Sequence, residues 1–220
     1  MATVLVAGAP PNADDYRDLV AGASRVVAVD GGADVCAVLG RVPDLAIGDF
    51  DTATVRAVSF LQDAGAEIVR YSPDKDESDL DLALDEIRAR GWGPVTIACA
   101  TGGRLDHTLA VLGSIASRAD IVHGLWEREM RAWPLDARVR SSLELGGSGA
   151  VVSILALGDS ATVTCSGMRY ALDHDELQSL GSHGLSNVIV ASSARVSVAA
   201  GRALVITVAA EGAPLAYATG

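Results

Sequence analysis

Short apolar runs alternate with longer amphipathic stretches through the first half of the chain. Apolar runs of this length predict strands, and stretches with helical spacing of apolar residues predict helices. The predicted strands are residues 3–7, 25–29, 45–47, 67–70, 94–98 and 120–123, and the predicted helices are residues 13–21, 33–39, 53–64, 78–90 and 106–117. Strands that alternate with helices and are nearly all apolar predict a mostly parallel sheet with flanking helices.

The pattern changes after Pro134, where short β runs follow one another without helices between them. These runs are residues 138–145, 150–157, 161–165, 187–191, 195–199 and 203–209. Closely spaced strands separated by turn residues are typical of a β sandwich. We therefore predict an α/β fold in two domains, with an α/β domain at residues 1–134 and an all-β sandwich domain at residues 135–220.

Composition narrows the classes of partner. The chain has 220 residues, is 50% hydrophobic and carries a net charge of −11, which argues against binding to nucleic acid or to a membrane surface. Cys36, Cys99 and Cys165 are far apart and have apolar neighbours, so we expect free thiols in a reducing compartment. No basic leader or membrane-spanning run is visible, and we expect a cytoplasmic protein.

Four predicted strand-to-helix turns carry carboxylates. They are Asp30-Gly31-Gly32, Gly48-Asp49-Phe50-Asp51-Thr52, Asp74-Lys75-Asp76-Glu77-Ser78-Asp79 and Gly102-Gly103-Arg104-Leu105-Asp106-His107. Because the carboxyl ends of parallel strands meet at one edge of the sheet, we expect these turns to lie together. Gathered carboxylates repel one another unless a cation binds them. The expected cation is Mg²⁺, with the phosphates of a nucleotide as further ligands.

Each turn taken alone has a structural alternative. Asp30 could cap a helix after a tight turn, Asp51 or Thr52 could cap the next helix, and Asp76 could cap a third with Asp79 in the capping-box position. Capping does not account for two carboxylates, Asp49 and Asp51, beside one glycine.

Basic residues accompany two of the four turns. Lys75 and Arg104 could bind phosphate. Asp106 could bind metal or act as a base, and His107 could orient it or contact the helix end.

Two common nucleotide-binding classes lack their motifs here. No G-x-x-x-x-G-K-[ST] loop occurs, so an ordinary P-loop enzyme is excluded. No G-x-G-x-x-G follows the first predicted strand, which argues against a nicotinamide enzyme.

The ordered set of motifs resembles the thiamine pyrophosphokinase family. The matching strings are Asp30-Gly31-Gly32-Ala33, Pro43-Asp44 with Ile47-Gly48-Asp49-Phe50-Asp51, Lys75-Asp76 with Ser78-Asp79, Gly102-Gly103-Arg104 with Asp106-His107, and Gly167, Tyr170, Gly184, Ser186-Asn187 and Gly201. The resemblance implies an N-terminal α/β catalytic domain that binds ATP and Mg²⁺, and a C-terminal β sandwich for thiamine binding and dimerisation. It implies a homodimer with shared active sites that transfers the pyrophosphoryl group of ATP to the thiamine hydroxyl and leaves AMP.

The resemblance also suggests a role for each residue type. The predicted metal ligands are Asp49, Asp51 and Asp79. Arg104 and Lys75 would neutralise the triphosphate, and Asp106 would orient or deprotonate the thiamine hydroxyl. The predicted ATP side further contains Asp30, Gly31, Gly32, Asp76, Ser78, Gly102, Gly103 and His107. The predicted thiamine side, contributed by the second subunit, contains Tyr170 as a stacking ring and Ser186 and Asn187 as hydrogen-bonding residues.

Two alternatives stay open at this point. A pyrophosphokinase of the same fold could act on another hydroxymethyl heterocycle such as a pterin, because the N-terminal motifs address ATP and metal. A nucleotide- or thiamine-sensing module without catalysis is the second alternative.

Overall fold

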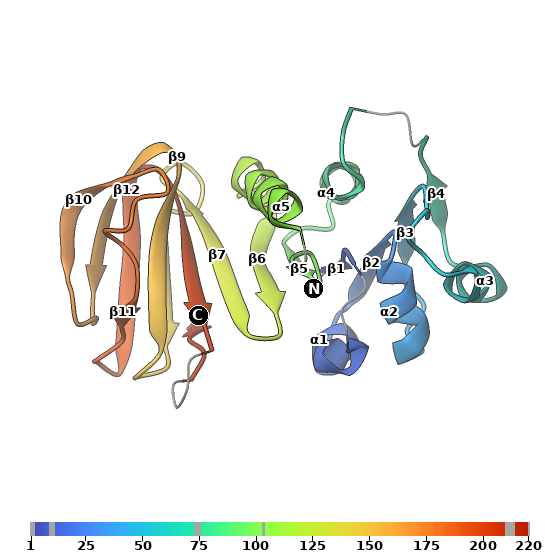
Figure 1. Cartoon of the computed structure of the whole chain (residues 1–220), viewed down its shortest axis with the longest axis horizontal. Coiled ribbons are helices and arrows are strands. Elements are labelled where there is room, and N and C mark those ends of the chain that lie inside the picture. Colours follow the sequence, from blue (N-terminus) through green and yellow to red (C-terminus); the bar gives the residue numbers. More distant parts are fainter. Residues whose placement is uncertain (1–2, 9–11, 73–75, 103, 210–213, 220) are drawn as a thin grey trace. The chain divides into compact units, whose positions relative to one another are not determined.

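The computed structural model of the chain describes residues 3–8, 12–72, 76–102, 104–209 and 214–219 (Figure 1). Two compact units are present. The first comprises Met1–Ser114 and Ile121–Arg128, and the second comprises Ile115–Asp120 and Glu129–Gly220. The division at Arg128 and Glu129 precedes the boundary that the sequence pattern predicts at residues 134 and 135.

The first unit is built on a parallel sheet. Its strands are β1 (Thr3–Val6), β2 (Arg25–Val29), β3 (Leu45–Gly48), β4 (Ile68–Arg70), β5 (Val95–Ala98) and β6 (Val122–Glu127), paired in the order β6-β5-β1-β2-β3-β4. Every residue of β1, β3 and β5 is buried, which is why apolar runs mark these strands. The predicted strand at 120–123 was placed too early, since β6 begins at Val122 and continues to Glu127.

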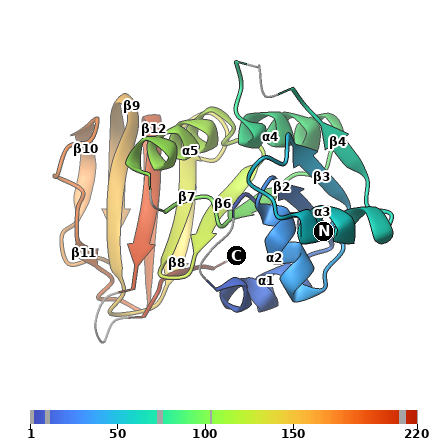
Figure 2. The same ribbon diagram turned by 45° about the vertical axis from the view of Figure 1, so that its right-hand side comes forward.

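Helices cover both faces of this sheet. The short helix η1 (Ala13–Tyr16), α1 (Arg17–Ala21), α2 (Gly32–Leu39) and α3 (Val55–Asp63) lie on one face. Helices α4 (Asp79–Ala89) and α5 (Leu105–Ser117) begin on the opposite face (Figures 1 and 2). The sheet therefore grows on both sides of β1, first toward β4 and later in the chain toward β6. In such a sheet the loops at the carboxyl ends of the strands form the usual ligand-binding edge.

Gly32 allows α2 to begin close to β1. A Cβ atom on Gly32 would lie 2.0 Å from the backbone oxygen of Val6, so no larger residue fits at this point. Close approach of the chain explains one glycine of the Asp30-Gly31-Gly32 turn without any ligand.

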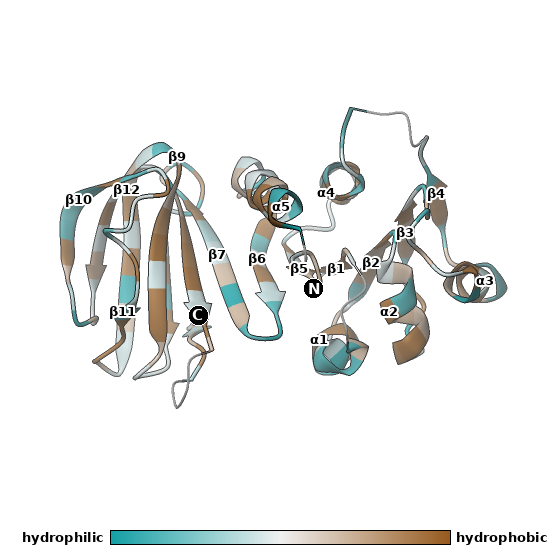
Figure 3. Cartoon of the chain, viewed as in Figure 1, coloured by the Kyte–Doolittle hydropathy of each residue, from teal (hydrophilic) through white to brown (hydrophobic). Residues whose placement is uncertain are grey.

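The second unit is an all-β domain. Its antiparallel strands are β7 (Met130–Asp136), β8 (Ser142–Gly146), β9 (Val151–Ser166), β10 (Leu172–Gln178), β11 (Asn187–Val188), β12 (Ser193–Val208) and β13 (Tyr217–Ala218). Figure 3 shows apolar segments along the strands of this domain, and alternate residues of β9 are buried, as expected for a strand with one face on a core. Their side chains pack with those of neighbouring strands, among them Trp133, Leu145, Ile154, Val163 and Val196. The predicted fold class, an α/β domain followed by an all-β domain, is confirmed.

Three details of the second unit differ from the sequence prediction. Strands β9 and β12 are each 16 residues long, whereas the pattern predicts two shorter strands in each place. The register of β12 shifts between Val198 and Ala200 and between Gly201 and Ala203, so the expected turn residues lie in bulges of a continuous strand. Strands β7, β10 and β13 were not predicted.

In the part of the chain that the structure describes, none of the helices combines the length and the apolar character needed to cross a lipid bilayer.

Candidate active site

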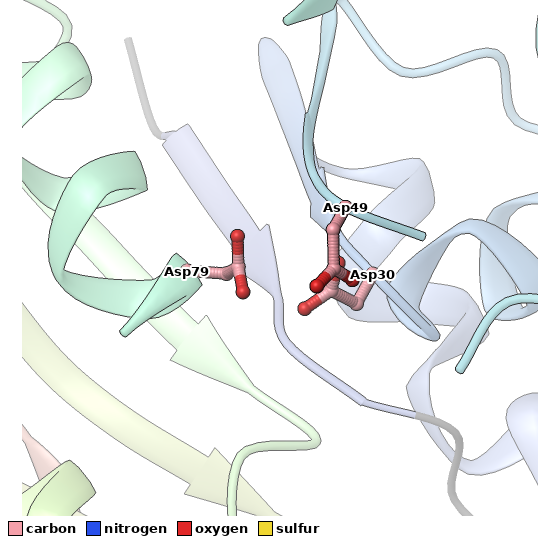
Figure 4. Close-up of side chains that lie close together, drawn as sticks. All are labelled: Asp30, Asp49 and Asp79. Atoms are coloured by element: carbon pink, nitrogen blue, oxygen red, sulfur yellow. The ribbon is translucent and has the colours of Figure 1, made fainter. Parts of the chain in front are cut away.

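Three aspartates from separate elements meet at the carboxyl edge of the parallel sheet. Asp30 follows β2, Asp49 follows β3, and Asp79 is the first residue of α4. Each offers one carboxylate oxygen, and these oxygens lie within 4.8 Å of one another. Figure 4 shows the Asp79 side chain pointing toward Asp49 and Asp30. We call Asp30, Asp49 and Asp79 the acid cluster. All three residues are half-buried.

The backbone around Asp30 is shaped to place its carboxylate in the cluster. Asp30 has φ 44, a left-handed conformation that Asp adopts more readily than most residues. Its Oδ1 accepts a hydrogen bond from the backbone N–H of Phe50 at 3.2 Å. Gly48 has φ +142, and a Cβ atom there would lie 1.8 Å from Asp30 Oδ1. The glycine beside Asp49 therefore makes room for the carboxylate of Asp30.

Like charges and burial act together on Asp30. Burial and, to a lesser extent, the nearby charges of Asp79 and Asp49 raise the pKa of Asp30, the Phe50 N–H opposes them, and the net pKa is about 7. A cluster of this kind holds either a proton or a cation near neutral pH. Three hard carboxylate oxygens in one place suit Mg²⁺, which prefers oxygen ligands.

The acid cluster shares two members with the predicted metal set. Asp49 and Asp79 lie in it, while the third member is Asp30, which the sequence analysis placed on the ATP side. Asp51 is exposed, and its backbone N–H donates to Asp49 Oδ1 at 3.0 Å. Phe50 between them has φ 64, so the backbone that joins the two aspartates is not extended. The role of Asp51 as a metal ligand stays a prediction.

The structure also settles the capping alternatives. Helix α2 has no side-chain cap, Thr54 caps α3 by accepting from Ala57 N at 3.2 Å, and Ser78 caps α4 by accepting from Asp81 N at 3.1 Å. The capping roles considered for Asp30, for Asp51 or Thr52 and for Asp76 are therefore wrong.

Other polar residues of these turns fix the loop that follows β3. The hydroxyl of Thr52 accepts from the N–H of Gly31 at 3.2 Å. Asp34 accepts from the backbone N–H of Thr54 at 3.0 Å and from the Thr54 hydroxyl. The loop that carries Asp49 is thus tied to the start of α2.

Arg104 and Asp106 form an exposed ion pair where α5 begins. Arg104 Nη2 lies 2.5 Å from Asp106 Oδ2, and the two side chains are 80% and 67% exposed. Hydrogen bonding from Arg104 lowers the pKa of Asp106 to about 2. Asp106 is not one of the three clustered acids, although α5 follows β5 at the same edge of the sheet. His107 and Gly102 are exposed, and Gly102 has φ 129. Lys75 and Gly103 lie outside the described residues.

A cation that the sequence analysis missed lies beside the acid cluster. The guanidinium of Arg70 stacks on the Phe50 ring, 4.8 Å from its centroid, and Arg70 Nη1 donates to the backbone oxygen of Asp49 at 3.4 Å. Its place at the end of an apolar run, on the same edge as the acids, was the available signal.

Two of the three predicted thiamine-side residues, Tyr170 and Asn187, border a cavity in the second unit. The cavity measures about 340 Å³ and is lined by Ile154, Tyr170, Ala171, Leu172, His183, Gly184, Leu185 and Asn187. Tyr170 is 63% exposed. Ser186 is not among the lining residues, and its N–H donates to Ser153 Oγ at 3.1 Å. His183 had no motif to mark it.

The side-chain amide of Asn187 bonds to the backbone of Tyr170 through both its oxygen and its nitrogen. Its Oδ1 accepts from Tyr170 N at 3.0 Å, and its Nδ2 donates to Tyr170 O at 2.6 Å. Asn187 is buried, so these bonds set the position of the exposed tyrosine.

Comparison with known proteins places these features in a family. The family model for the catalytic domain of thiamin pyrophosphokinase matches residues 16–122, and the family model for its vitamin B1 binding domain matches residues 138–203. The chain belongs to the thiamine pyrophosphokinase family. The catalytic-domain match contains the whole acid cluster, and the vitamin B1 match contains the cavity beside Tyr170.

Individual relatives agree with this membership. The chain is 34% identical to a thiamine pyrophosphokinase of Bacillus subtilis (strain 168) over 106 residues, which are 48% of the chain and 50% of the relative. It is 24% identical to thiamine pyrophosphokinase 1 of Oryza sativa subsp. japonica over 164 residues, which are 70% of the chain and 62% of the relative. The matches thus span about half and about three fifths of the lengths of these relatives.

Solved thiamine pyrophosphokinase structures share the fold. The Bacillus subtilis structure has a TM-score of 0.82 at 22% identity, and the match covers 94% of this chain and 99% of the chain in that structure. The Geobacillus thermodenitrificans structure has a TM-score of 0.80 at 24% identity, with 97% and 100% covered. The Candida albicans structure has a TM-score of 0.78 at 14% identity, with 94% and 89% covered.

Proposed function

We propose that this chain transfers the pyrophosphoryl group of ATP to the hydroxyl of thiamine, giving thiamine diphosphate and AMP. The observation that carries the proposal is the pair of family matches, one in each unit, with the acid cluster inside the catalytic match and the cavity inside the vitamin B1 match. Both family models refer to thiamin, and no comparable observation supports a pterin substrate or a sensing module.

The acid cluster fits the divalent cation that such a reaction needs. Asp30, Asp49 and Asp79 would hold Mg²⁺, and Asp51 is the further ligand expected from the sequence. Bound Mg²⁺ neutralises phosphate charge and polarises the phosphorus that is attacked. The raised pKa of Asp30 supports this assignment, because a cation at that place relieves the repulsion among the three carboxylates.

The remaining residues of the first unit would position the reacting groups. The thiamine oxygen attacks the β-phosphorus of ATP, the bond from that phosphorus to the α–β bridging oxygen breaks, and AMP leaves. Asp106 would accept a hydrogen bond from the attacking hydroxyl. While Arg104 is paired with it, the pKa of Asp106 is about 2, so it acts as an orienting acceptor. When Arg104 turns to the phosphates, the pKa of Asp106 rises and it can take the hydroxyl proton. Lys75 would add a second cation near the phosphates.

The second unit would supply the thiamine side. The exposed ring of Tyr170 is suited to stack on a heterocycle, and Asn187 would act by holding Tyr170 in place. Ser186 stays a predicted hydrogen-bonding residue. We propose a homodimer in which the acid cluster of one subunit works with the Tyr170 cavity of the other, as the family resemblance implies.

A steady-state assay of AMP release tests the substrate. Wild-type protein with ATP and Mg²⁺ is expected to turn over thiamine and to leave a hydroxymethylpterin unchanged. Faster release with the pterin would reject thiamine as the substrate.

Matched variants test the metal site. Asp49→Asn and Asp79→Asn are expected to lower turnover by about 100-fold or more, because a metal ion supplies several kcal/mol of charge stabilisation. Asp85→Asn is the control, since Asp85 lies on the same helix and pairs with Arg88 at the surface. Equal turnover in Asp79→Asn and Asp85→Asn would reject the assignment.

Complementation tests the shared site. Asp79→Asn and Tyr170→Ala subunits, each weakly active, are mixed and allowed to exchange. If sites form between subunits, about a quarter of the sites are intact after random exchange, and activity rises above that of either variant. No rise after confirmed subunit exchange would reject a site built from two chains.

A further inference from the structure

The carboxylate of Glu127 joins three parts of the first unit. Glu127 is the last residue of β6. Its Oε1 accepts hydrogen bonds from the backbone N–H of Ala100 at 2.8 Å and of Thr101 at 3.0 Å, and its Oε2 accepts from the hydroxyl of Tyr16 at 2.8 Å. One side chain therefore ties the end of β6 to the loop after β5 and to helix η1.

The two amide groups belong to a segment that has left the sheet. The last pair between β5 and β6 joins Ala98 to Trp126, and the next residue, Cys99, has φ 59. Ala100 is 2% exposed, so its N–H is shielded from water and needs an acceptor. The Glu127 carboxylate provides it and extends the link between these strands beyond their last backbone pair.

Glu127 is itself held from the side of η1. Tyr16 is buried, and burial together with Glu127 raises the pKa of its phenol, so the hydroxyl stays protonated and donates. Arg128, the residue after β6, has its Nε 3.6 Å from Asp15 Oδ2 and adds a second link to η1. Because Tyr16 holds Oε2 of Glu127, the other oxygen, Oε1, has a defined position for the two amides.

The segment that Glu127 holds leads into the ion pair at the start of α5. Arg104 N donates to Gly102 O at 2.9 Å, and the exposed side chains of Arg104 and Asp106 bond to each other. We propose that Glu127 is a positioning residue, which fixes the loop after β5 through the Ala100 and Thr101 amides and so sets where Arg104 and Asp106 are presented to the substrates. This inference rests on the proposed function.

A set of variants separates positioning from a general effect on folding. Glu127→Gln keeps a carbonyl oxygen for both amides and can reverse the bond to Tyr16 by donating from its NH₂. Glu127→Ala removes the acceptor. We expect Glu127→Ala to lower kcat by about 10- to 100-fold, as displaced catalytic groups do, with the thiamine KM within about twofold, and Glu127→Gln to restore kcat. An equal loss in both variants would overturn the proposal.

A double-mutant cycle identifies the route of the effect. If Glu127 acts through the loop that carries Arg104, Glu127→Ala lowers kcat little further in a protein that already carries Arg104→Ala. Fully multiplicative losses would overturn the proposal. Should Glu127→Ala not fold, Glu127→Asp replaces it, because the shorter carboxylate cannot reach both amides from β6, and the same outcomes are expected.

Hydrogen exchange tests the same inference without any substrate. The amides of Ala100 and Thr101 are expected to exchange about 10-fold faster or more in Glu127→Ala, and at nearly the wild-type rate in Glu127→Gln. Unchanged exchange in Glu127→Ala would overturn the positioning role. Absence of thiamine turnover in the wild type would instead reject the proposed function, so the two failures are distinct.

Discussion

Replacing Asp30 by Asn is expected to stabilise the metal-free protein at alkaline pH and to weaken its response to Mg²⁺. In the folded protein, burial and the charges of Asp79 and Asp49 raise the pKa of Asp30 to about 7, whereas the pKa of an Asp in an unfolded chain is about 3.9. The unfolded state therefore releases its proton first as pH rises. The contribution of Asp30 to the free energy of unfolding is lost between about pH 4 and pH 7 and stays lost above that range.

The size of this effect follows from the pKa difference. A difference of about 3 between the two states sets a ceiling of ~4 kcal/mol. Because Asp30 is only half-buried, solvent screening reduces that ceiling to about 1–2 kcal/mol. Asn has no charge and keeps an oxygen for the Phe50 N–H, so it recovers this amount at pH 8. For a chain of this length the gain corresponds to a Tm increase of about 2–8 °C.

Thermal unfolding in EDTA and in excess Mg²⁺ measures both parts of the prediction. In EDTA, the Tm of Asp30→Asn minus that of wild type is expected to grow from pH 5 to pH 8. At pH 8, Mg²⁺ is expected to raise the Tm of wild type more than that of the variant, because the variant has lost a ligand. Asp85→Asn is the control and should show neither trend. A lower Tm for Asp30→Asn than for wild type at pH 8 in EDTA would refute the reasoning.

The remaining predictions concern the supports of the two sites. Gly48→Ala places a Cβ atom 1.8 Å from Asp30 Oδ1, so we expect a loss of about 2–4 kcal/mol in stability and of the Mg²⁺-dependent Tm increase. The control is Gly65→Ala, because Gly65 also has a positive φ but has no atom within 4 Å of the added carbon. This variant should lose about 1 kcal/mol of stability and keep the Mg²⁺-dependent Tm increase. Equal Mg²⁺ responses in the two variants would contradict the prediction. Asn187→Ala removes both bonds to the Tyr170 backbone, so the thiamine KM should rise about 10-fold with the ATP KM within twofold in steady-state assays, and an unchanged thiamine KM would contradict it.

The parallel half of the fold could be predicted because its strands are runs of consecutive apolar residues. For the all-β half, the sequence predicts the class of domain but not the bounds of its strands. Strand β10 reads Leu-Asp-His-Asp-Glu-Leu-Gln and buries only Leu172 and Leu177, so no run of apolar residues marks it. Gly158 and Gly201 have positive φ inside β9 and β12, where the sequence suggests turns. Pro134 pairs with Leu204 within β7, although proline has no backbone N–H to donate and is disfavoured within a sheet.

The candidate site shows the same limit. The turns that carry acids could be found from their order along the chain, but membership of the acid cluster depends on tertiary contacts. Asp30 enters it because Gly48, eighteen residues later, leaves space for its carboxylate. Asp51, only two residues from Asp49, is not among the three clustered acids. Glu127 ends strand β6 without belonging to any motif, and its partners Tyr16 and Ala100 are far from it in the sequence, so only the structure connects them.

The fate of a label at the β-phosphorus of ATP tests the central claim most directly. Wild-type protein is incubated with thiamine, Mg²⁺ and ATP labelled at that phosphorus, and the products are separated and weighed by mass spectrometry. Transfer of a pyrophosphoryl group puts the label in thiamine diphosphate and leaves unlabelled AMP. Label recovered in ADP beside thiamine monophosphate, or retained in unreacted ATP, would contradict the account.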